Sequence, residues 1–376
     1  MLKRTIQRAQ HNAIFVRHIM ASINEPSEIK ATHVGKLYTV PNDVVLKLDF
    51  NKVLPSKFSS QIDTLSECSW LIRQPFVEIL NEFSNITKET PVSRFVLYGR
   101  FGTGKSITLY QLIHYAHSQK WVIMNIKSVL DITRRVTETQ ENKHNEGKLD
   151  TPNHAVNALT LFKVQNQHIW DKLGEIKTTK DYIWTKNDKT SAGKPLTDIV
   201  EMGLSSPIVS TDCFGALIDE LKYCSTNGDI KILVAIDDAN SLYGKTNFKK
   251  LDGSYALPND LSMVCHLKKF FDKDWKNGAL VMVADEKEFK DARDILTVPL
   301  VTPLELFGEA GYDDIYPFIG IQTKNYNEKE IDAIYNYYKS KNWLATPAAN
   351  TEKGKTQLTY ISAFNPYYFE RLCAFV

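Results

Sequence analysis

The sequence predicts an α/β protein: a parallel sheet with helices on both faces, followed by a small helical lid. Three observations support this class. Short apolar runs that read as buried strands alternate with segments of helical spacing. The stretch LYGRFGTGKS, residues 97–106, joins one such run to a helix. From residue 327 onward the pattern is helical throughout.

The sheet is expected to contain five strands, at 94–98, 121–126, 232–236, 280–284 and, with a weaker pattern, 318–322. A helix is expected over 106–117, because apolar residues recur there at helical spacing. In parallel sheets of this kind, ligands bind at the carboxyl ends of the strands. The glycine-rich stretch lies at such an end.

The N-terminal part of the chain has its own composition. Residues 1–24 contain four basic side chains and no acidic residue, as in a mitochondrial targeting segment, although a basic, disordered arm is the alternative. Residues 25–93 form an irregular N-terminal extension, with a helix expected from about Gln61 to Phe83.

The remaining residues divide into a domain at 94–326, which contains the sheet and the glycine-rich stretch, and the lid at 327–376. The domain carries an insertion at about 137–195, which is predicted to be too hydrophilic for the core. Two interpretations of this insertion remain open: a surface excursion that meets a partner, and a disordered loop.

Charge and hydropathy limit the classes of partner. The formal net charge of the 376 residues is only +2, so contact with nucleic acid would depend on local patches. No run approaches the roughly 20 apolar residues that a membrane-spanning helix needs. We therefore expect no membrane span.

The glycine-rich stretch matches G-x-x-x-x-G-K-[ST] at Gly99, Gly104, Lys105 and Ser106. Glycines let backbone N–H groups converge on phosphate oxygens, and the start of the following helix favours an anion. In this motif Lys105 neutralises the terminal phosphates and the Ser106 hydroxyl coordinates Mg²⁺. The alternative is a chance match on an ordinary turn.

The strand at 232–236 ends in two carboxylates, Asp237 and Asp238. Asp237 is expected to hold the magnesium ion through its water shell, and Asp238 to polarise a water molecule. An ordinary strand end followed by an Asx turn is the alternative interpretation.

The sequence leaves hydrolysis and the choice of base open. Catalysis needs extra positive charge on the transferring phosphoryl group, and only two arginines follow Arg135. Arg371 is the better candidate and Arg293 the weaker one, while a surface ion pair of Arg371 with Glu370 or Glu352 is the alternative. The N-K-x-D tetrapeptide that selects guanine in switch GTPases does not occur.

Several stretches together resemble the death-associated protein family, the GTP-binding component of the small subunit of the mitochondrial ribosome. They are YTVPNDVVLKL, LPSKF, LIRQP, LYGRFGTGKS, LVAIDDANSLYGKT, FDKDWKNGALV, NYN and FNPYYFERLCAF. The resemblance runs from about residue 38 to the C-terminus, and the order and spacing of the stretches are specific.

The resemblance implies a P-loop NTPase fold with an AAA-like helical lid, in a structural component of the small subunit in the mitochondrial matrix. It implies a purine nucleotide with Mg²⁺, either GTP or GDP, with ATP left open. The residues around the phosphates would be Gly99, Arg100, Phe101, Gly102, Thr103, Gly104, Lys105, Ser106 and Ile107, and those around the metal Ser106 and Asp237. Slow GTP or ATP hydrolysis stays open.

The implied partners are the small-subunit rRNA and ribosomal proteins, with contacts to the large subunit also considered. Lysines at 245, 249, 250, 268, 269, 273 and 276 are candidates for rRNA contact. Nearby aromatics, Phe270, Phe271 and Trp275, fit a core better than a base-stacking platform. Two alternatives remain: a cycling mitochondrial NTPase with a remodelling role, and a cell-death adaptor, which no sequence feature supports.

Overall fold

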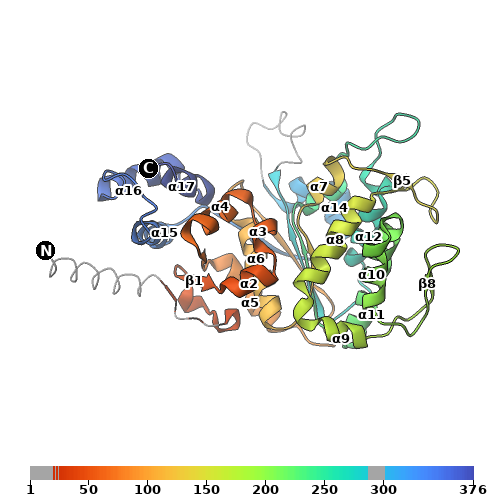
Figure 1. The fold of residues 1–376 in the computed structure, drawn as a ribbon. Coiled ribbons are helices and arrows are strands. Elements are labelled where there is room, and N and C mark those ends of the chain that lie inside the picture. Colours follow the sequence, from red (N-terminus) through yellow and green to blue (C-terminus); the bar gives the residue numbers. More distant parts are fainter. Residues whose placement is uncertain (1–19, 22, 24, 287–300) are drawn as a thin grey trace. The chain divides into compact units, whose positions relative to one another are not determined.

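The structure is a computed structural model, and it describes residues 20, 21, 23, 25–286 and 301–376. The targeting prediction for residues 1–24 and the weaker candidate Arg293 therefore lie outside the described residues, apart from positions 20, 21 and 23. The chain divides into two units that are each built from separate stretches (Figure 1). Unit 1 comprises 1–82, 99–118 and 322–376, and unit 2 comprises 83–98 and 119–321.

Unit 2 contains the predicted sheet, with strand order β11-β3-β10-β9-β4. The strands are β3 (Ser93–Tyr98), β4 (Val122–Ile126), β9 (Ile232–Ile236), β10 (Gly278–Val283) and β11 (Ile319–Gln322). The pairings of β10 with β3, of β10 with β9 and of β4 with β9 are parallel. The α/β class and all five strands are thus confirmed.

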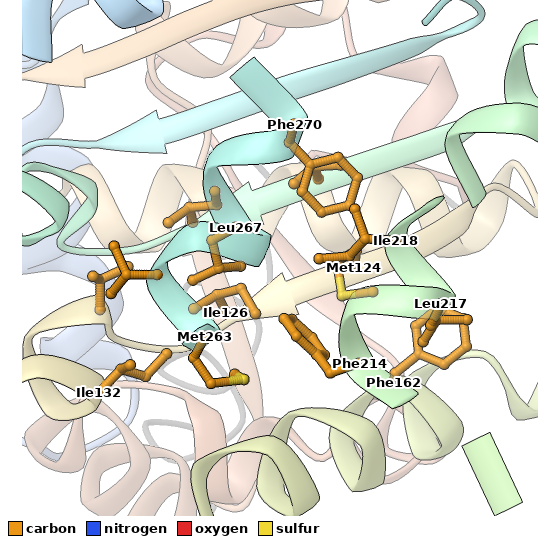
Figure 2. Close-up of a cluster of buried hydrophobic side chains, with 14 of the residues drawn as sticks. Met124, Ile126, Ile132, Phe162, Phe214, Leu217, Ile218, Met263, Leu267 and Phe270 are labelled. Atoms are coloured by element: carbon orange, nitrogen blue, oxygen red, sulfur yellow. The ribbon is translucent and has the colours of Figure 1, made fainter. Parts of the chain in front are cut away.

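Side chains on both faces of β3, β4, β9 and β10 are buried, as expected of parallel strands that read as continuous apolar runs, whereas the edge strand β11 is mostly exposed. Along β4, for example, Met124 and Ile126 belong to the large core of unit 2 on one face, and Ile123 is fully buried on the other. Figure 2 shows Met124 and Ile126 packed among Phe162, Phe214 and other apolar side chains of the covering helices.

Helices and short strands complete unit 2. They are α7 (Val129–Arg134), β5 (Gln140–Glu141), β6 (Leu149–Asp150), α8 (Pro152–Gln165), α9 (Trp170–Glu175), β7 (Tyr182–Ile183), β8 (Lys189–Thr190), α10 (Thr197–Ser205), α11 (Ser210–Asn227), α12 (Ser262–Lys268) and α14 (Pro303–Ile315). In Figure 1, α8, α10, α11 and α12 gather on one side of the strands.

The prediction that the stretch 137–195 is too hydrophilic for the core is wrong. Leu159 and Phe162 of α8 belong to the core of unit 2, and Trp184 is only 5% exposed. The indole Nε1 of Trp184 donates a hydrogen bond to Thr190 Oγ1 (2.9 Å), which ties the hairpin of β7 and β8 together. A few large side chains at the right spacing outweigh the polar residues between them.

His266 on α12 predicts a pH dependence of stability. Burial, helped by the positive charge of Lys269, lowers the pKa of His266 to about 4. The negative charge of Asp219 partly opposes this decrease. The folded state therefore keeps this ring neutral, whereas the unfolded chain takes up a proton near pH 6.5. We expect the free energy of unfolding to fall by up to about 3 kcal/mol between pH 6.5 and 4.

The measurement is chemical denaturation of the wild type and of His266→Gln at several pH values. The variant should lose less stability on acidification than the wild type, with the remaining slope coming from other buried histidines such as His114, whose pKa burial lowers to about 3. His144→Gln, at an exposed histidine, serves as the control. Equal slopes in the wild type and His266→Gln would disprove this prediction.

Unit 1 combines an N-terminal group of elements, one helix from the middle of the chain and the C-terminal helices. They are β1 (Leu37–Val40), α2 (Asn42–Lys47), α3 (Phe50–Val53), α4 (Ser56–Leu65), β2 (Cys68–Leu71), α5 (Gln74–Phe83), α6 (Lys105–Ser118), α15 (Glu328–Ser340), α16 (Glu352–Ser362) and α17 (Pro366–Cys373). The predicted helix after the glycine-rich loop and the helical pattern from residue 327 are both confirmed.

The helix predicted from Gln61 to Phe83 is wrong in its middle. Residue Ser66 adopts a left-handed backbone (φ 54°) and ends α4, and β2 follows. β2 pairs antiparallel with β1, which the sequence analysis assigned to an irregular lead-in. Trp70 of β2 is 1% exposed, and its ring packs against Tyr38, its partner on β1, and against Phe50. Burial of this large side chain stabilises the extended conformation of β2.

Candidate functional site

The glycine-rich loop connects the end of β3 to the start of α6 and has a backbone that favours glycine. Gly99, Gly102 and Gly104 have φ values of 137°, 78° and 95°, a backbone region that residues with a Cβ rarely adopt. Lys105 is the first residue of α6. A glycine loop that opens the N-terminus of a 14-residue helix is a suitable site for a phosphate group.

Two of these glycines also lie in close contact with other parts of unit 1. A Cβ added at Gly99 would stand 2.4 Å from the carbonyl oxygen of Thr323. One added at Gly102 would stand 2.6 Å from Asn365 Oδ1 and 2.8 Å from Tyr367 Cβ. The loop is therefore fitted tightly against the segment 323–367, which comes from the other end of the chain.

Gly99→Ala tests this fit. We expect a loss of about 3 kcal/mol of unfolding free energy, because the new Cβ meets a backbone carbonyl and the φ value is strained. Gly35→Ala is the matched control, since Gly35 also has a positive φ (86°) but a Cβ there meets nothing within 4 Å. It should cost only about 1 kcal/mol. Equal losses in urea denaturation would contradict the tight fit.

Lys105 lies inside the loop. Lys105 is only 4% exposed, and its Nζ donates hydrogen bonds to the carbonyl oxygens of Gly99 (2.9 Å) and Arg100 (3.0 Å). Ionised lysine is almost never buried without partners. Here the loop backbone itself holds the ammonium group at the start of α6.

The other predicted loop residues differ in exposure. Thr103 is 1% exposed, and its hydroxyl donates to the Arg100 carbonyl oxygen (2.8 Å) and shares a hydrogen bond with Thr323 Oγ1 (2.7 Å). Ser106 and Ile107 are half-buried in the first turn of α6. Arg100 and Phe101 are exposed, and the Phe101 ring stacks edge-on against Tyr367 at 5.1 Å between centroids.

Three consecutive carbonyl groups of the loop accept hydrogen bonds from outside it. Asn365 Nδ2 donates to the Phe101 oxygen (2.8 Å), and the Tyr367 N–H donates to the Gly102 oxygen (3.1 Å). Arg73 Nη1 donates to the Thr103 oxygen (2.7 Å). The donors come from α17, its N-cap and the segment before α5.

Arg73 is itself held by a buried carboxylate. Its Nε and Nη2 donate to Glu330 Oε1 (2.9 Å) and Oε2 (3.3 Å), with side-chain exposures of 12% and 6%. Nη2 also donates to the carbonyl oxygens of Lys324 and Asn325, and the guanidinium lies 5.0 Å from the Tyr326 ring centre. This two-point pairing fixes the orientation of the guanidinium plane.

The predicted acidic pair lies in unit 2, directly after β9. Asp237 and Asp238 are each 8% exposed. Asp238 has a left-handed backbone (φ 53°), and its N–H donates to Asp237 Oδ1 (3.0 Å). Ser128 Oγ, at the N-cap of α7, donates to Asp238 Oδ2 (2.7 Å). The carboxylates are thus held in fixed positions at the carboxyl end of the sheet.

Several residues that build these sites were not assigned a role from the sequence. In unit 2, Asn240 bridges the ends of β9 and β10, because its amide donates to the Asp285 oxygen (2.8 Å) and accepts from the Asp285 N–H (3.0 Å). In unit 1 these residues are Arg73, Glu330 and Asn365. Arg73 and Asn365 occur in the stretches LIRQP and FNPYYFERLCAF, but no local pattern showed that their partners lie in the loop.

Arg371 lies on α17 in unit 1. Its guanidinium carbon stands 5.0 Å from the ring centre of Phe375. Burial raises the pKa of the neighbouring Glu370, and the charges of Arg371 and Lys57 oppose this increase. The structure thus shows Arg371 in a cation–π contact and close enough to influence Glu370, and its role toward a phosphate stays a prediction.

The aromatic residues near the proposed rRNA-contact lysines form part of the core, as expected. Phe270 and Trp275 are fully buried and Phe271 is 6% exposed. Some of the lysines have acidic partners: Lys250 pairs with Asp260, Lys268 with Asp314 and Lys269 with Asp219. Lys245, Lys249 and Lys273 are exposed. In the part of the chain that the structure describes, no helix meets the length and hydropathy needed to cross a membrane.

Comparison with known proteins gives consistent matches along most of the chain. The model of the family described as mitochondrial ribosomal death-associated protein 3 matches residues 70–372. The small ribosomal subunit protein mS29 of Bos taurus is 35% identical over 355 residues, covering 94% of this chain and 87% of the relative. The protein of the same name from Mus musculus is 34% identical, with coverages of 94% and 88%. The mS29 protein of Neurospora crassa is 24% identical over 260 residues, with coverages of 67% and 51%.

Proposed function

Because the chain belongs to the mitochondrial ribosomal death-associated protein 3 family, we propose that its glycine-rich loop binds a purine nucleotide that stabilises it within the mitochondrial small ribosomal subunit. The relatives carry the name of a small-subunit ribosomal protein. A structural ribosomal role in the mitochondrial matrix follows from this membership. The nucleotide is the part of the proposal that rests on the loop.

The backbone of the loop carries the nucleotide proposal. Its three positive-φ glycines give the backbone the conformational freedom to turn its N–H groups toward a phosphate, and Lys105 supplies one positive charge at the start of α6. When bound, Mg²⁺ would neutralise phosphate charge. We assign it to Ser106, the hydroxyl residue of the loop motif, and to Asp237, the carboxylate that follows β9 in the sequence.

The expected consequence of nucleotide binding is stabilisation. A ligand that binds only the folded state adds about 2.7 kcal/mol at a hundred times its Kd. Thermal denaturation of the purified protein with Mg²⁺ and GTP, GDP or ATP measures this effect and identifies the base. Mass spectrometry of small molecules released from the native ribosomal particle tests occupancy. An unchanged melting temperature with all three nucleotides would disprove the proposal.

A cycling NTPase is the second candidate, and the position of Asp238 favours it. This buried carboxylate adopts a backbone conformation that is uncommon outside glycine, next to the proposed metal ligand Asp237. The test is phosphate release from GTP or ATP by the purified protein. Release that Asp238→Asn abolishes, with nucleotide binding retained, would establish turnover; the structural proposal expects release to be slow or absent.

The proposed rRNA contacts involve the exposed lysines of unit 2. In the sequence, Lys245 and Lys249 follow β9 and Lys273 precedes β10, and all three side chains are exposed. Lysine side chains that meet phosphate make binding dependent on salt. We expect the triple alanine variant to incorporate more weakly than the wild type at low ionic strength, and its incorporation to depend less on salt.

A further inference from the structure

We propose that Arg73, Glu330 and Asn365 are positioning residues for the phosphate loop, which they shape without touching the nucleotide. The inference rests on the proposed function and adds a means by which the C-terminal segment controls that site. Its structural basis is the row of three loop carbonyls, at residues 101, 102 and 103, that accept hydrogen bonds from outside the loop.

The geometry of the peptide bond links these carbonyls to the phosphate site. In a trans peptide the C=O of one residue and the N–H of the next point in opposite directions. Because the oxygens of Phe101, Gly102 and Thr103 point toward their outside donors, the N–H groups of Gly102, Thr103 and Gly104 point away from them. Fixing the carbonyls therefore fixes the direction of three amide donors, each of which points away from the outside donor that holds the preceding carbonyl.

Arg73 provides the most constrained of the three contacts. Its guanidinium joins the Thr103 carbonyl to the Glu330 carboxylate, and both side chains are largely buried. Glu330 Oε2 also accepts from the N–H of Asn327, at the N-cap of α15. The start of α15 and the loop are thus attached to the same guanidinium group. A shift of α15 would move the loop through Arg73.

Asn365 makes two kinds of contact that one substitution can separate. Its Oδ1 accepts from the N–H groups of Tyr367 and Tyr368 and caps α17, while its Nδ2 donates to the Phe101 oxygen. Asn365→Asp keeps the capping acceptor and removes the donor to the loop. The Phe101 carbonyl then faces a carboxylate, so the loop loses its outside support while the helix cap remains.

Asn350→Asp is the matched control. Asn350 also lies in the C-terminal segment of unit 1, and its Nδ2 donates to the carbonyl oxygens of Leu344 and Thr346 at 2.9 Å. The substitution likewise converts an amide to a carboxylate, adds one negative charge and removes an Nδ2 donor. The carbonyls that lose this donor lie outside the loop. Any general effect of destabilising this segment appears in both variants.

The experiment combines hydrogen exchange of the full chain without nucleotide and calorimetry with Mg²⁺ and GDP. For Asn365→Asp we expect amide exchange in the peptide covering residues 99–106 to rise at least about tenfold above that of Asn350→Asp. We expect the GDP affinity to fall about tenfold, against less than about twofold for the control. Arg73→Lys, which keeps the charge but loses the planar fork, should show the same pattern.

The two readouts separate this inference from the proposed function. Equal loop exchange in Asn365→Asp and Asn350→Asp would overturn the positioning role, whatever the affinities. Equal loss of GDP affinity in both variants would also overturn it. If the wild type binds no nucleotide but loop exchange still rises in Asn365→Asp alone, the proposed function fails and the positioning of the loop by the C-terminal segment stands.

Discussion

Lys105→Ala is expected to remove stabilisation by nucleotide almost completely. A hydrogen bond from a charged donor contributes about 1.5–3 kcal/mol, and the loop backbone holds the Lys105 ammonium group at the start of α6. We expect the affinity for GDP or GTP to fall about a hundredfold. The melting temperature of the variant should then stay the same when nucleotide and Mg²⁺ are added.

Lys222→Ala is the control for the loss of a buried lysine. Lys222 on α11 donates to the Lys269 carbonyl oxygen (2.7 Å) and pairs with Asp272 and Asp274, all within unit 2. Its alanine variant should melt at a lower temperature than the wild type but still respond fully to nucleotide. If Lys105→Ala responds to nucleotide as strongly as Lys222→Ala, the loop is not the binding site.

Arg73→Ala is expected to have the largest effect on stability. Removing one partner of a buried ion pair costs about 3–5 kcal/mol, because the other charge is left unpaired. Here the loss would leave Glu330, with a side-chain exposure of 6%, and the Thr103 carbonyl without their shared donor. We expect the denaturation midpoint of the variant in urea to fall accordingly.

Lys47→Ala gives the comparison for an exposed pair. Lys47 and Asp43 are 2.9 Å apart on α2, with side-chain exposures of 57% and 63%. Exposed pairs of this kind contribute little to stability, because water and salt screen the two charges. A loss in Arg73→Ala no greater than that in Lys47→Ala would show that the buried pair contributes little. Glu330→Gln provides an independent check, since it removes the charge and nearly preserves the volume.

Most of the sheet was predictable because β3, β4, β9 and β10 are buried on both faces. A parallel strand that packs on both sides reads as an uninterrupted apolar run, and the segments at 94–98 and 232–236 are of this kind. The strand CSWL at 68–71 was missed because it has only four residues and lies between two helices. Its pairing with β1 across 27 or more intervening residues has no local signal.

The glycine loop was predictable as a motif, but its supports were not. A motif fixes residues that are close in the sequence, whereas Arg73 and Glu330 are 257 positions apart and Asn365 is 264 from Phe101. Arg371 attracted attention because arginine is rare in the second half of the chain. Arg73, from the N-terminal extension, donates to a loop carbonyl, and the role of Arg371 toward a phosphate stays a prediction.

Unit 1 is built from three stretches that are far apart in the sequence, and this determines when its loop can complete its contacts during synthesis. Donors for the loop carbonyls at 101 and 102 come from residues 365 and 367, more than 260 positions later in the chain. Because domains fold as their residues emerge, the loop waits for these supports until more than 260 further residues have been translated. A frameshift or stop codon shortly before residue 365 would therefore yield a product whose loop lacks these contacts, even though every residue of its signature motif is present.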